Sequence, residues 1–341
     1  MAFKNVGTFD LGMAGGNAGR AVAMDAAGIA SGQAFLVSEL EKRDTLVRTP
    51  LTSFTYTRDI PVRVGGGWVD FVSAMNVEYG LTGGSDGAAS IVSANAADGT
   101  PLVQANFNKD VWKAHAIAAG TRVFWVDMMK GNMTGRNIDT LLRDGLRLAY
   151  DKHMDQNVYL GIPQYGTTGL VNNSDVAAST VNAGVGGYTE WNTKTPDEIL
   201  LDVNEAILAA WAASEYDLDA VPNHIIMPYE QYNYIATTKV STIAEKTILT
   251  FLLENNVAKQ NGSDLFIGAT VWCKGAGTGG SDRMVVYCNK ERYVAVDELV
   301  PLTRAMTSTN AERFSYDTVY AGNVSECEIF YAQTLVYADG I

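Results

Sequence analysis

The sequence contains few of the residues from which most catalytic and metal sites are built. Among its 341 residues there are only three cysteines and three histidines. The cysteines, none of which belongs to a C-x-x-C pair, are Cys273, Cys288 and Cys327. An odd and sparse set of this kind is typical of a reducing compartment and argues against a disulfide framework.

Long apolar runs are also missing. The most apolar stretch near the N-terminus, residues 21–37, is interrupted by Asp25 and Gln33, and a membrane-spanning helix needs about 20 apolar residues. The first seven residues lack the basic region and apolar run of a signal peptide. We therefore expect a protein that does not associate with membranes and that is located, or assembled, in the cytoplasm.

Positive charge is scarce, because 25 Lys and Arg residues face 38 Asp and Glu residues and the formal net charge is −13. Dedicated nucleic-acid binders need clustered Lys and Arg, so the composition argues against that class. What the sequence does have is apolar residues, which make up 47% of the chain against 18% charged residues. This profile predicts a folded protein with a sizeable core and, from its length, two domains.

One segment, Gly83-Gly-Ser-Asp-Gly87, matches the G-x-S-x-G motif of hydrolases. That chemistry needs a buried strand before the serine and a helix after it, whereas this serine lies among loop residues. The possible histidine bases, His115, His153 and His224, have no supporting pattern around them. We interpret the motif as a flexible loop tip.

A second glycine-rich segment, 275–280, matches G-x-G-x-x-G, but strand residues follow it instead of the helix that a dinucleotide site requires. It predicts a turn between two strands. Asp151, His153 and Asp155 lie close together, but helix positions two residues apart point about 200° apart, so we expect no shared metal and a solvent-facing Asp151 and Asp155. The sequence therefore predicts no catalytic residues, no cofactor, no metal and no enzyme.

The first 130 residues have little helical character. Residues 1–30 predict an extended arm, and a short helix is expected over about 32–47. Alternating residues on both sides of a loop rich in Gly, Ser and Asp predict strands at 53–64, 69–77, 111–117 and 121–126. The simplest interpretation is a long β-hairpin with a flexible tip, which has too little core to be stable alone and needs a partner.

Amphipathic helices and further strands follow. Helices are predicted from Ile138 to Met154, ending near 157–161, from the capping box Thr195-Pro-Asp-Glu198, and from Thr242 through Leu252. A strand at 224–227 and a short helix from Pro228 separate the last two. Later strands are expected at 265–273, 284–288, 293–296 and 326–337. The predicted class is α+β.

Several segments follow one another in a characteristic order. They are Ser38-Glu-Leu-Glu41, Ala97–Val103, the segment Asp155–Asn173 with its Gly-x-x-Gly-Leu-x-Asn-Asn turn, Ser281–Tyr287, Val300-Pro-Leu302 and Tyr331–Ile341. In this order they resemble the major capsid proteins of tailed bacteriophages and prophages with the Hong Kong 97 fold, in the branch related to encapsulin-like shell proteins.

The resemblance implies an α+β fold of the Hong Kong 97 type with five parts. These are an N-terminal arm with a short helix (1–50), an extended β-hairpin loop with flanking strands (51–133), a peripheral domain with a long spine helix (134–220), an axial domain (221–290) and C-terminal strands that return to the peripheral domain (291–341). Contacts between subunits are expected at the loop tip, at Gly80, Gly83, Gly84 and Gly87.

The implied function is structural. Copies of the chain would self-assemble into pentamers and hexamers of an icosahedral phage head, which is assembled in the bacterial cytoplasm and encloses double-stranded DNA without sequence-specific binding. Because the chain starts close to the arm, a separate scaffolding protein is expected, with a portal and a possible decoration protein as further partners. Lys109 and Lys113 lie in the loop region, but no pattern pairs either with an asparagine, so no cross-link is predicted. An encapsulin-like nanocompartment shell and an unrecognised soluble α+β enzyme are the alternatives.

Overall fold

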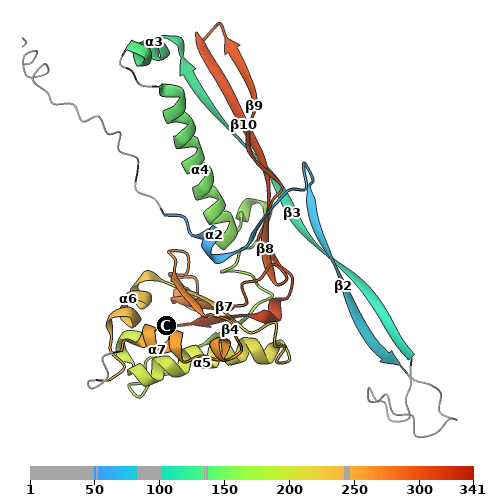
Figure 1. Cartoon of the computed structure of the whole chain (residues 1–341), viewed down its shortest axis with the longest axis vertical. Coiled ribbons are helices and arrows are strands. Elements are labelled where there is room, and N and C mark those ends of the chain that lie inside the picture. The colour runs from blue at the N-terminus through green and yellow to red at the C-terminus, as the bar shows by residue number, and fades with distance from the viewer. Residues whose placement is uncertain (1–49, 51–52, 83–101, 134, 136, 242–245) are drawn as a thin grey trace, which may run out of the picture. The chain divides into compact units, whose positions relative to one another are not determined.

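The computed structural model of the chain describes residues 50, 53–82, 102–133, 135, 137–241 and 246–341 (Figure 1). The chain divides into two units, Met1–Ser53 and Phe54–Ile341, and nearly all described residues belong to the second. The predicted helix at 32–47 lies outside the described residues. Among the described residues no helix is long and apolar enough to cross a membrane.

Helices and strands occur in similar proportion along the described chain. The α-helices are α2 (Tyr56–Asp59), α3 (Trp125–Met133), α4 (Ile138–Leu160), α5 (Pro196–Ala213), α6 (Tyr229–Thr237), α7 (Ile248–Glu254) and α8 (Val257–Gln260). The strands are β1 (Val62–Val64), β2 (Phe71–Thr82), β3 (Leu102–Phe124), β4 (Ala177–Thr180), β5 (His224–Met227), β6 (Phe266–Ala269), β7 (Arg283–Tyr287), β8 (Val294–Glu298), β9 (Val300–Asn310), β10 (Ser315–Ser325), β11 (Glu328–Ile329) and β12 (Leu335–Asp339).

A mixed five-stranded sheet, in the order β4-β12-β7-β5-β6, holds both hydrophobic cores of the described chain. Along β5, Ile226 belongs to a core that includes Met154 and Val158 of α4, while Ile225 and Met227 belong to a second core. That second core includes residues of α5 and α7, which Figure 1 shows gathered about this sheet. Because both faces are covered, β5, β7 and β12 are buried throughout, as near-continuous apolar runs require.

The buried residues of helix α4 all lie in its C-terminal half. The side chain of Asn137 caps its N-terminus, and its buried residues begin at Tyr150. At the other end the chain turns back at Gly161 and Gly169, where a Cβ would lie 2.5 Å from the Thr167 carbonyl oxygen and 2.3 Å from the Tyr159 carbonyl carbon. Backbone N–H groups of residues 170 and 171 then donate to carbonyls of the last helical turn, which would otherwise lack partners. The predicted helix and its end are confirmed.

The sheet β2-β3-β10-β9 is built around one long strand. The first half of β3 pairs with β2 alone, and its second half, from Ala114 to Phe124, pairs with β10. Figure 1 shows β3 as one continuous arrow beside first β2 and then β10. We call β2 and residues 102–113 of β3 the ribbon. The predicted long hairpin is confirmed, and its tip, 83–101, lies outside the described residues.

Several predicted elements have different limits in the structure. Residues 53–64 do not form one strand, because Tyr56–Asp59 is helical and only Val62–Val64 is a strand. Val126 belongs to α3 instead of the preceding strand. The third predicted helix begins at Ile248, because Thr247 is its N-cap, and Thr242 lies outside the described residues.

The C-terminal strands also differ from the prediction in length and number. Only Phe266–Ala269 is a strand within 265–273, and 326–337 contains two short strands separated by a 3₁₀ turn. The sequence pattern missed the hairpin of β9 and β10, half of whose residues are Thr, Ser, Ala or Asn, so that apolar and polar types do not alternate clearly.

Candidate assembly surface

The ribbon is amphipathic, and its apolar face is exposed. The register pairs Val77 with Phe107 and Met75 with Lys109, so odd-numbered residues of both strands share one face. Apart from Lys109, Lys113, Ser73 and Ala105, the described side chains of this face are large and apolar. We call these the apolar ribbon face: Phe71, Met75, Val77, Tyr79, Val103, Phe107 and Val111.

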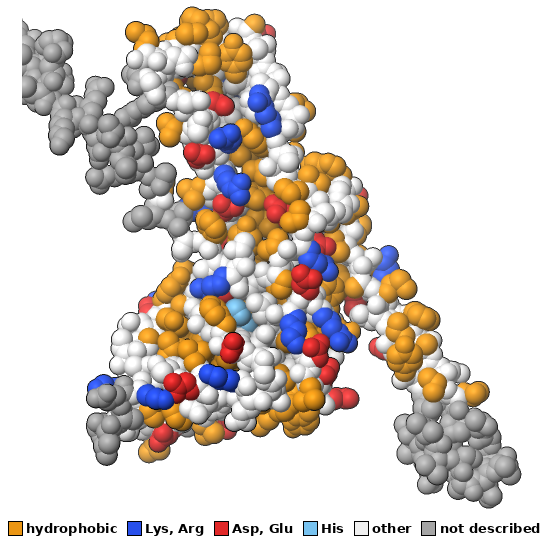
Figure 2. All heavy atoms as spheres, in the orientation of Figure 1, with side chains coloured by type: hydrophobic (Ala, Val, Ile, Leu, Met, Phe, Trp, Pro, Cys, Tyr) orange, Lys and Arg blue, Asp and Glu red, His pale blue; other side chains and the backbone are white. Residues whose placement is uncertain are grey.

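Exposure of this face is high along its whole described length. Met75, Tyr79, Val103 and Phe107 are 66–77% exposed, and Figure 2 shows hydrophobic side chains gathered along the ribbon. The opposite face carries mainly polar side chains away from the root: Asn76, Glu78, Gln104, Asn106, Asn108 and Asp110. A two-stranded ribbon gains little stability by itself, and an exposed apolar patch on this scale marks an interaction surface.

The root of the ribbon is fixed to the rest of the chain through β3. The backbone N–H of Lys113 donates to Glu326 Oε1 at 2.8 Å, and its Nζ donates to the Tyr165 carbonyl oxygen at 2.9 Å. Next to it His115 stacks on the Tyr165 ring with a centroid distance of 4.6 Å. These contacts hold the ribbon where it leaves the sheet.

Of the glycines predicted to make subunit contacts, only Gly80 is among the described residues. Gly80 lies in β2, where a side chain would meet open space, because no atom lies within 4 Å of the position that a Cβ would take. Gly83, Gly84 and Gly87 lie outside the described residues, as does the G-x-S-x-G motif. The structure therefore places Gly80 on the ribbon, and the contact assigned to these glycines stays a prediction.

A second exposed apolar group lies where β3 runs into α3, beside the turn between β9 and β10. Trp125 and Phe314 contact each other with ring centroids 5.1 Å apart, and the Trp125 N–H donates to the Phe314 carbonyl oxygen at 3.0 Å. Phe124, Val126, Met129 and Met133 are also exposed. Sequence reasoning missed this group, because its members come from three elements whose proximity no local pattern indicates.

The buried His224 pairs with a carboxylate, but as part of the core. Its Nε2 lies 3.2 Å from Asp59 Oδ1, its Nδ1 faces the Asn289 amide at 3.4 Å, and its ring stacks on Phe266. Burial lowers the pKa of His224 against the opposing effect of Asp59. Burial by itself would raise the pKa of Asp59, but hydrogen bonds from His224, Arg58 and Tyr159 bring it below its usual value. With both ring nitrogens occupied, His224 does not act as a base toward a hydroxyl.

The prediction that Asp155 faces solvent is wrong. Asp155 is buried and accepts hydrogen bonds from the backbone N–H groups of Thr55 (2.7 Å) and Tyr56 (3.1 Å) and from Trp272 Nε1 (2.6 Å). It thereby joins α2, α4 and the segment after β6. The available signal was its position one residue after Met154 and four before Tyr159, both fully buried.

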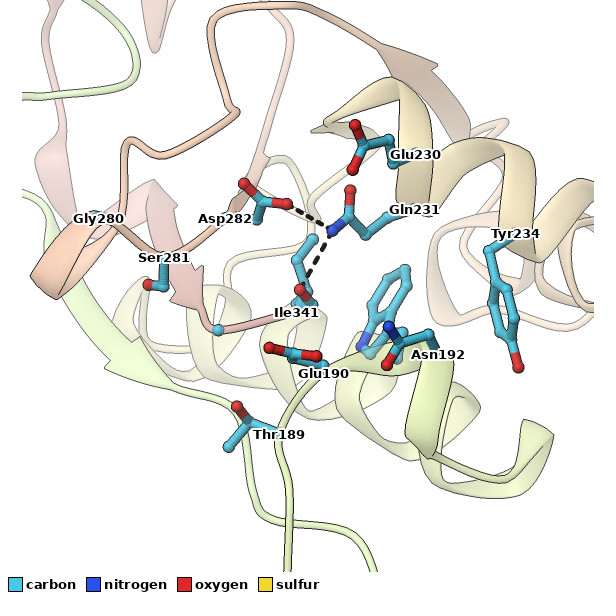
Figure 3. Close-up of a pocket in the computed structure, with 12 residues that line it drawn as sticks. Thr189, Glu190, Asn192, Glu230, Gln231, Tyr234, Gly280, Ser281, Asp282 and Ile341 are labelled. Atoms are coloured by element: carbon cyan, nitrogen blue, oxygen red, sulfur yellow. Dashed lines mark hydrogen bonds between the residues drawn. The ribbon is translucent and has the colours of Figure 1, made fainter.

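A cavity of about 460 Å³ lies between the C-terminus, the start of α6 and the turn before β7. Figure 3 shows Gln231 between Asp282 and Ile341, and its Nε2 donates to Asp282 Oδ2 at 2.6 Å and to the Ile341 carbonyl oxygen at 3.3 Å. The hydroxyl of Ser281, which also lines the cavity, donates to the Thr278 carbonyl oxygen instead of pairing with a base. Across the described residues no cluster of His, Cys, Asp and Glu is arranged to hold a metal.

The glycine-rich segment 275–280 lies between β6 and β7 and is followed by a strand, as predicted. Thr278 donates to Asp339 Oδ2 through its backbone N–H at 2.8 Å, and Arg283 holds the same carboxylate with two hydrogen bonds. The segment is thus fixed against β12.

The cysteines Cys273, Cys288 and Cys327 are free and buried.

Comparison with known proteins identifies the family. The family model described as major capsid protein matches residues 87–341, which is most of the chain. The chain belongs to the major capsid protein family. No curated protein matches this major capsid protein in sequence.

Solved structures confirm the fold of the major capsid protein. The capsid of Myoviridae phage XM1 superimposes with a TM-score of 0.72 at 16% identity, over 89% of this chain and 98% of that one. The capsid of the native GTA particle gives 0.61 at 10% identity over 93% and 99%, and that of Microbacterium phage Oxtober96 gives 0.57 at 14% over 90% and 97%. The α+β fold of the Hong Kong 97 type is therefore confirmed, and the family indicates a structural role in a virion capsid.

Proposed function

We propose that copies of this major capsid protein self-assemble into pentamers and hexamers of an icosahedral phage head, and that each copy lays its apolar ribbon face on a neighbouring copy. The observation that carries the proposal is the contrast between the two ribbon faces, one mainly apolar and exposed, the other mainly polar away from the root, with Leu102 as an exposed apolar exception. The family explains why such a surface persists in a soluble subunit, because its partner is another copy of the chain.

The energetics fit an assembly of many modest contacts. Burying one large apolar side chain stabilises a contact by about 1.5–3 kcal/mol. The loss of translational and rotational freedom on association offsets a large part of the gain summed over the apolar ribbon face. One ribbon on one neighbour thus gives a reversible contact. Head-to-tail contacts of this kind close into rings, and several contacts per subunit multiply into a stable shell.

The proposed division of labour follows the sequence-based boundaries. Residues 1–50 serve as the arm, 51–133 as the extended loop with Gly80, Gly83, Gly84 and Gly87 at its contact tip, 134–220 as the peripheral domain, 221–290 as the axial domain and 291–341 as returning strands. A scaffolding protein, a portal and a possible decoration protein are the proposed partners, with assembly in the host cytoplasm.

Double-stranded DNA is the proposed content of the head. The net charge of −13 is compatible with enclosing a polyanion without binding it, because an acidic wall repels the packed phosphates over a Debye length of about 10 Å. No sequence-specific contact is proposed.

The test replaces one exposed side chain on each face of the ribbon. Phe107→Lys places a charge in the apolar ribbon face, and Asn108→Lys places the same charge on the neighbouring position of the polar face. Both side chains are exposed, so both subunits should keep their thermal stability. We expect shells from Asn108→Lys and the unmodified chain, and unassembled subunits from Phe107→Lys, by electron microscopy and sedimentation.

Equal shell yields from the two variants would contradict the role of the apolar ribbon face. The content of the purified particles tests the rest of the proposal. Particles grown in the presence of the other phage components should contain DNA. Particles that contain a protein cargo and no DNA would instead support the nanocompartment alternative.

A further inference from the structure

Three consecutive glycines join β1 to the ribbon. Gly65, Gly66 and Gly67 have φ angles of +121°, +127° and +81°, which side-chain-bearing residues rarely adopt. We call residues 65–67 the glycine strap. A Cβ on Gly66 would lie 2.6 Å from Leu299 Cδ2, so the strap lies directly against the residue between β8 and β9.

Backbone hydrogen bonds fix the strap on that side. The Gly65 N–H donates to the Glu298 carbonyl oxygen at 3.1 Å, and the Gly67 N–H donates to the Leu299 carbonyl oxygen at 3.2 Å. These bonds continue the pairing of β1 with β8. In the turn that follows, the Val69 N–H donates to the Gly67 carbonyl oxygen at 3.1 Å.

Asn323 of β10 adds a buried side-chain donor to the carbonyl groups of Gly67 and Val69. Its side-chain Nδ2 donates to the Val69 carbonyl oxygen at 2.8 Å and to the Gly67 carbonyl oxygen at 3.3 Å, and the residue is only 3% exposed. A buried amide that spans two carbonyls in this way holds the end of the strap and the start of β2 in one fixed relation.

An irregularity in the sheet lies beside Asn323. The register between β10 and β9 shifts between Ala321 and Asn323. At Gly322 the backbones come so close that a Cβ would lie 2.9 Å from the Val300 carbonyl oxygen. Bulges of this kind re-aim a side chain, and here the neighbouring side chain is the one that reaches the strap.

We propose that Asn323 is a positioning residue that sets the angle of the ribbon by holding the glycine strap, so that the apolar ribbon face is presented to a second copy in one orientation. The identity of the partner rests on the proposed function. One ribbon strand, β3, is already fixed because it continues into the sheet with β10. The other strand, β2, reaches the body through three glycines, and glycine has the largest freedom to lose.

The test measures the ribbon angle directly. Spin labels at Glu78→Cys on the ribbon and Lys152→Cys on α4 use exposed positions, and the native cysteines are buried. The unchanged strap should give one narrow distance distribution in the unassembled full-length subunit. We expect Asn323→Ala to widen that distribution at least twofold and to lower shell yield by about tenfold, the effect of losing buried hydrogen bonds.

A second variant covers the case in which Asn323→Ala does not fold. Gly67→Ala leaves the buried amide in place and adds a methyl group where no atom lies within 4 Å, but at a φ of +81°. The substitution strains the backbone of the strap itself, and it should widen the spin-label distance distribution as Asn323→Ala does. The matched controls are Asn157→Ala, which removes a buried amide bonded to the Ser325 carbonyl oxygen, and Gly145→Ala, at an open position in α4. Both should leave the distribution narrow.

The outcomes separate this inference from the proposed function. A distribution that stays narrow in Asn323→Ala and Gly67→Ala overturns the positioning role, whatever happens to the shells. Equal widening in Asn157→Ala also overturns it, because any buried amide would then have the same effect. A widened distribution with normal shell yield supports the positioning role and contradicts the proposed contact of the ribbon with a second copy.

Discussion

The five-stranded sheet and the ribbon both contain large apolar residues, but these residues are buried in the sheet and exposed on the ribbon. Strands β5, β7 and β12 are buried along their whole length, because helices and loops of the same chain supply cover on both faces. The ribbon carries phenylalanine, methionine, valine and tyrosine on one face, and these side chains are exposed. Burial is therefore decided by available cover and not by composition. The proposed function assigns the cover of the ribbon to another subunit.

The two regions should differ most when one apolar side chain is shortened in each. Ile226→Ala opens a cavity in a fully buried site and should lower the free energy of unfolding by about 2–5 kcal/mol. Val77→Ala on the ribbon should change it by less than about 0.5 kcal/mol. Denaturant unfolding of the unassembled subunit measures both values. Similar losses at the two positions would show that the ribbon is covered within its own chain.

The buried carboxylate of Asp155 tests the same difference between covered and exposed positions within one helix, α4. Asp155→Ala leaves three donors without a partner, the N–H groups of residues 55 and 56 and the Trp272 indole. We expect a loss of about 2–4 kcal/mol in the free energy of unfolding. Asp144→Ala, on the exposed side of the same helix, is the matched control and should have little effect. An equally mild Asp155→Ala would mean that water satisfies those donors.

A pH dependence is expected from Glu328, which is fully buried in the body next to Arg63 and Asp297. Burial raises its pKa from 4.5 to about 7, with Asp297 acting in the same direction and Arg63 opposing. Because the unfolded chain ionises at the lower pKa, Glu328 should reduce stability as the pH rises from about 4.5 to 7, by about 1–3 kcal/mol. The difference in unfolding free energy between the unmodified subunit and Glu328→Gln, measured across that range, should show this decline. A pH-independent difference would exclude it.

Local patterns predicted the elements whose apolar residues face their own chain. The helix from Ile138 and the strand His224–Met227 are confirmed because their periodicity reflects burial within one subunit. The hairpin was also predictable, since alternation exists on the ribbon even without a cover in the same chain. The helical turn Tyr56–Asp59 was not predictable from its alternating residues, because it depends on Asp155, about 100 residues away.

The site itself was predicted only in part. The loop region was assigned to subunit contacts, but sequence alone could not show that Met75 and Phe107 lie on the same face, because that depends on the register between two strands separated by a long loop. The roles of Asp155 and Asn323 depend on hydrogen bonds between distant elements. Neither residue belongs to a local motif.

Strand β3 has a mechanical consequence. Its 23 residues form one unbroken element of about 75 Å, and an extended strand cannot lengthen under tension without losing its ladder of hydrogen bonds. A pull on the outer end of the ribbon is therefore transmitted along β3 into the sheet with β10 and on to the start of α3. The partner strand β2 instead connects to β1 through a segment that contains the glycine strap, which hydrogen bonds with residues 298, 299 and 323 hold in place. The ribbon thus transmits a pull through a continuous strand on one side and through these hydrogen bonds on the other.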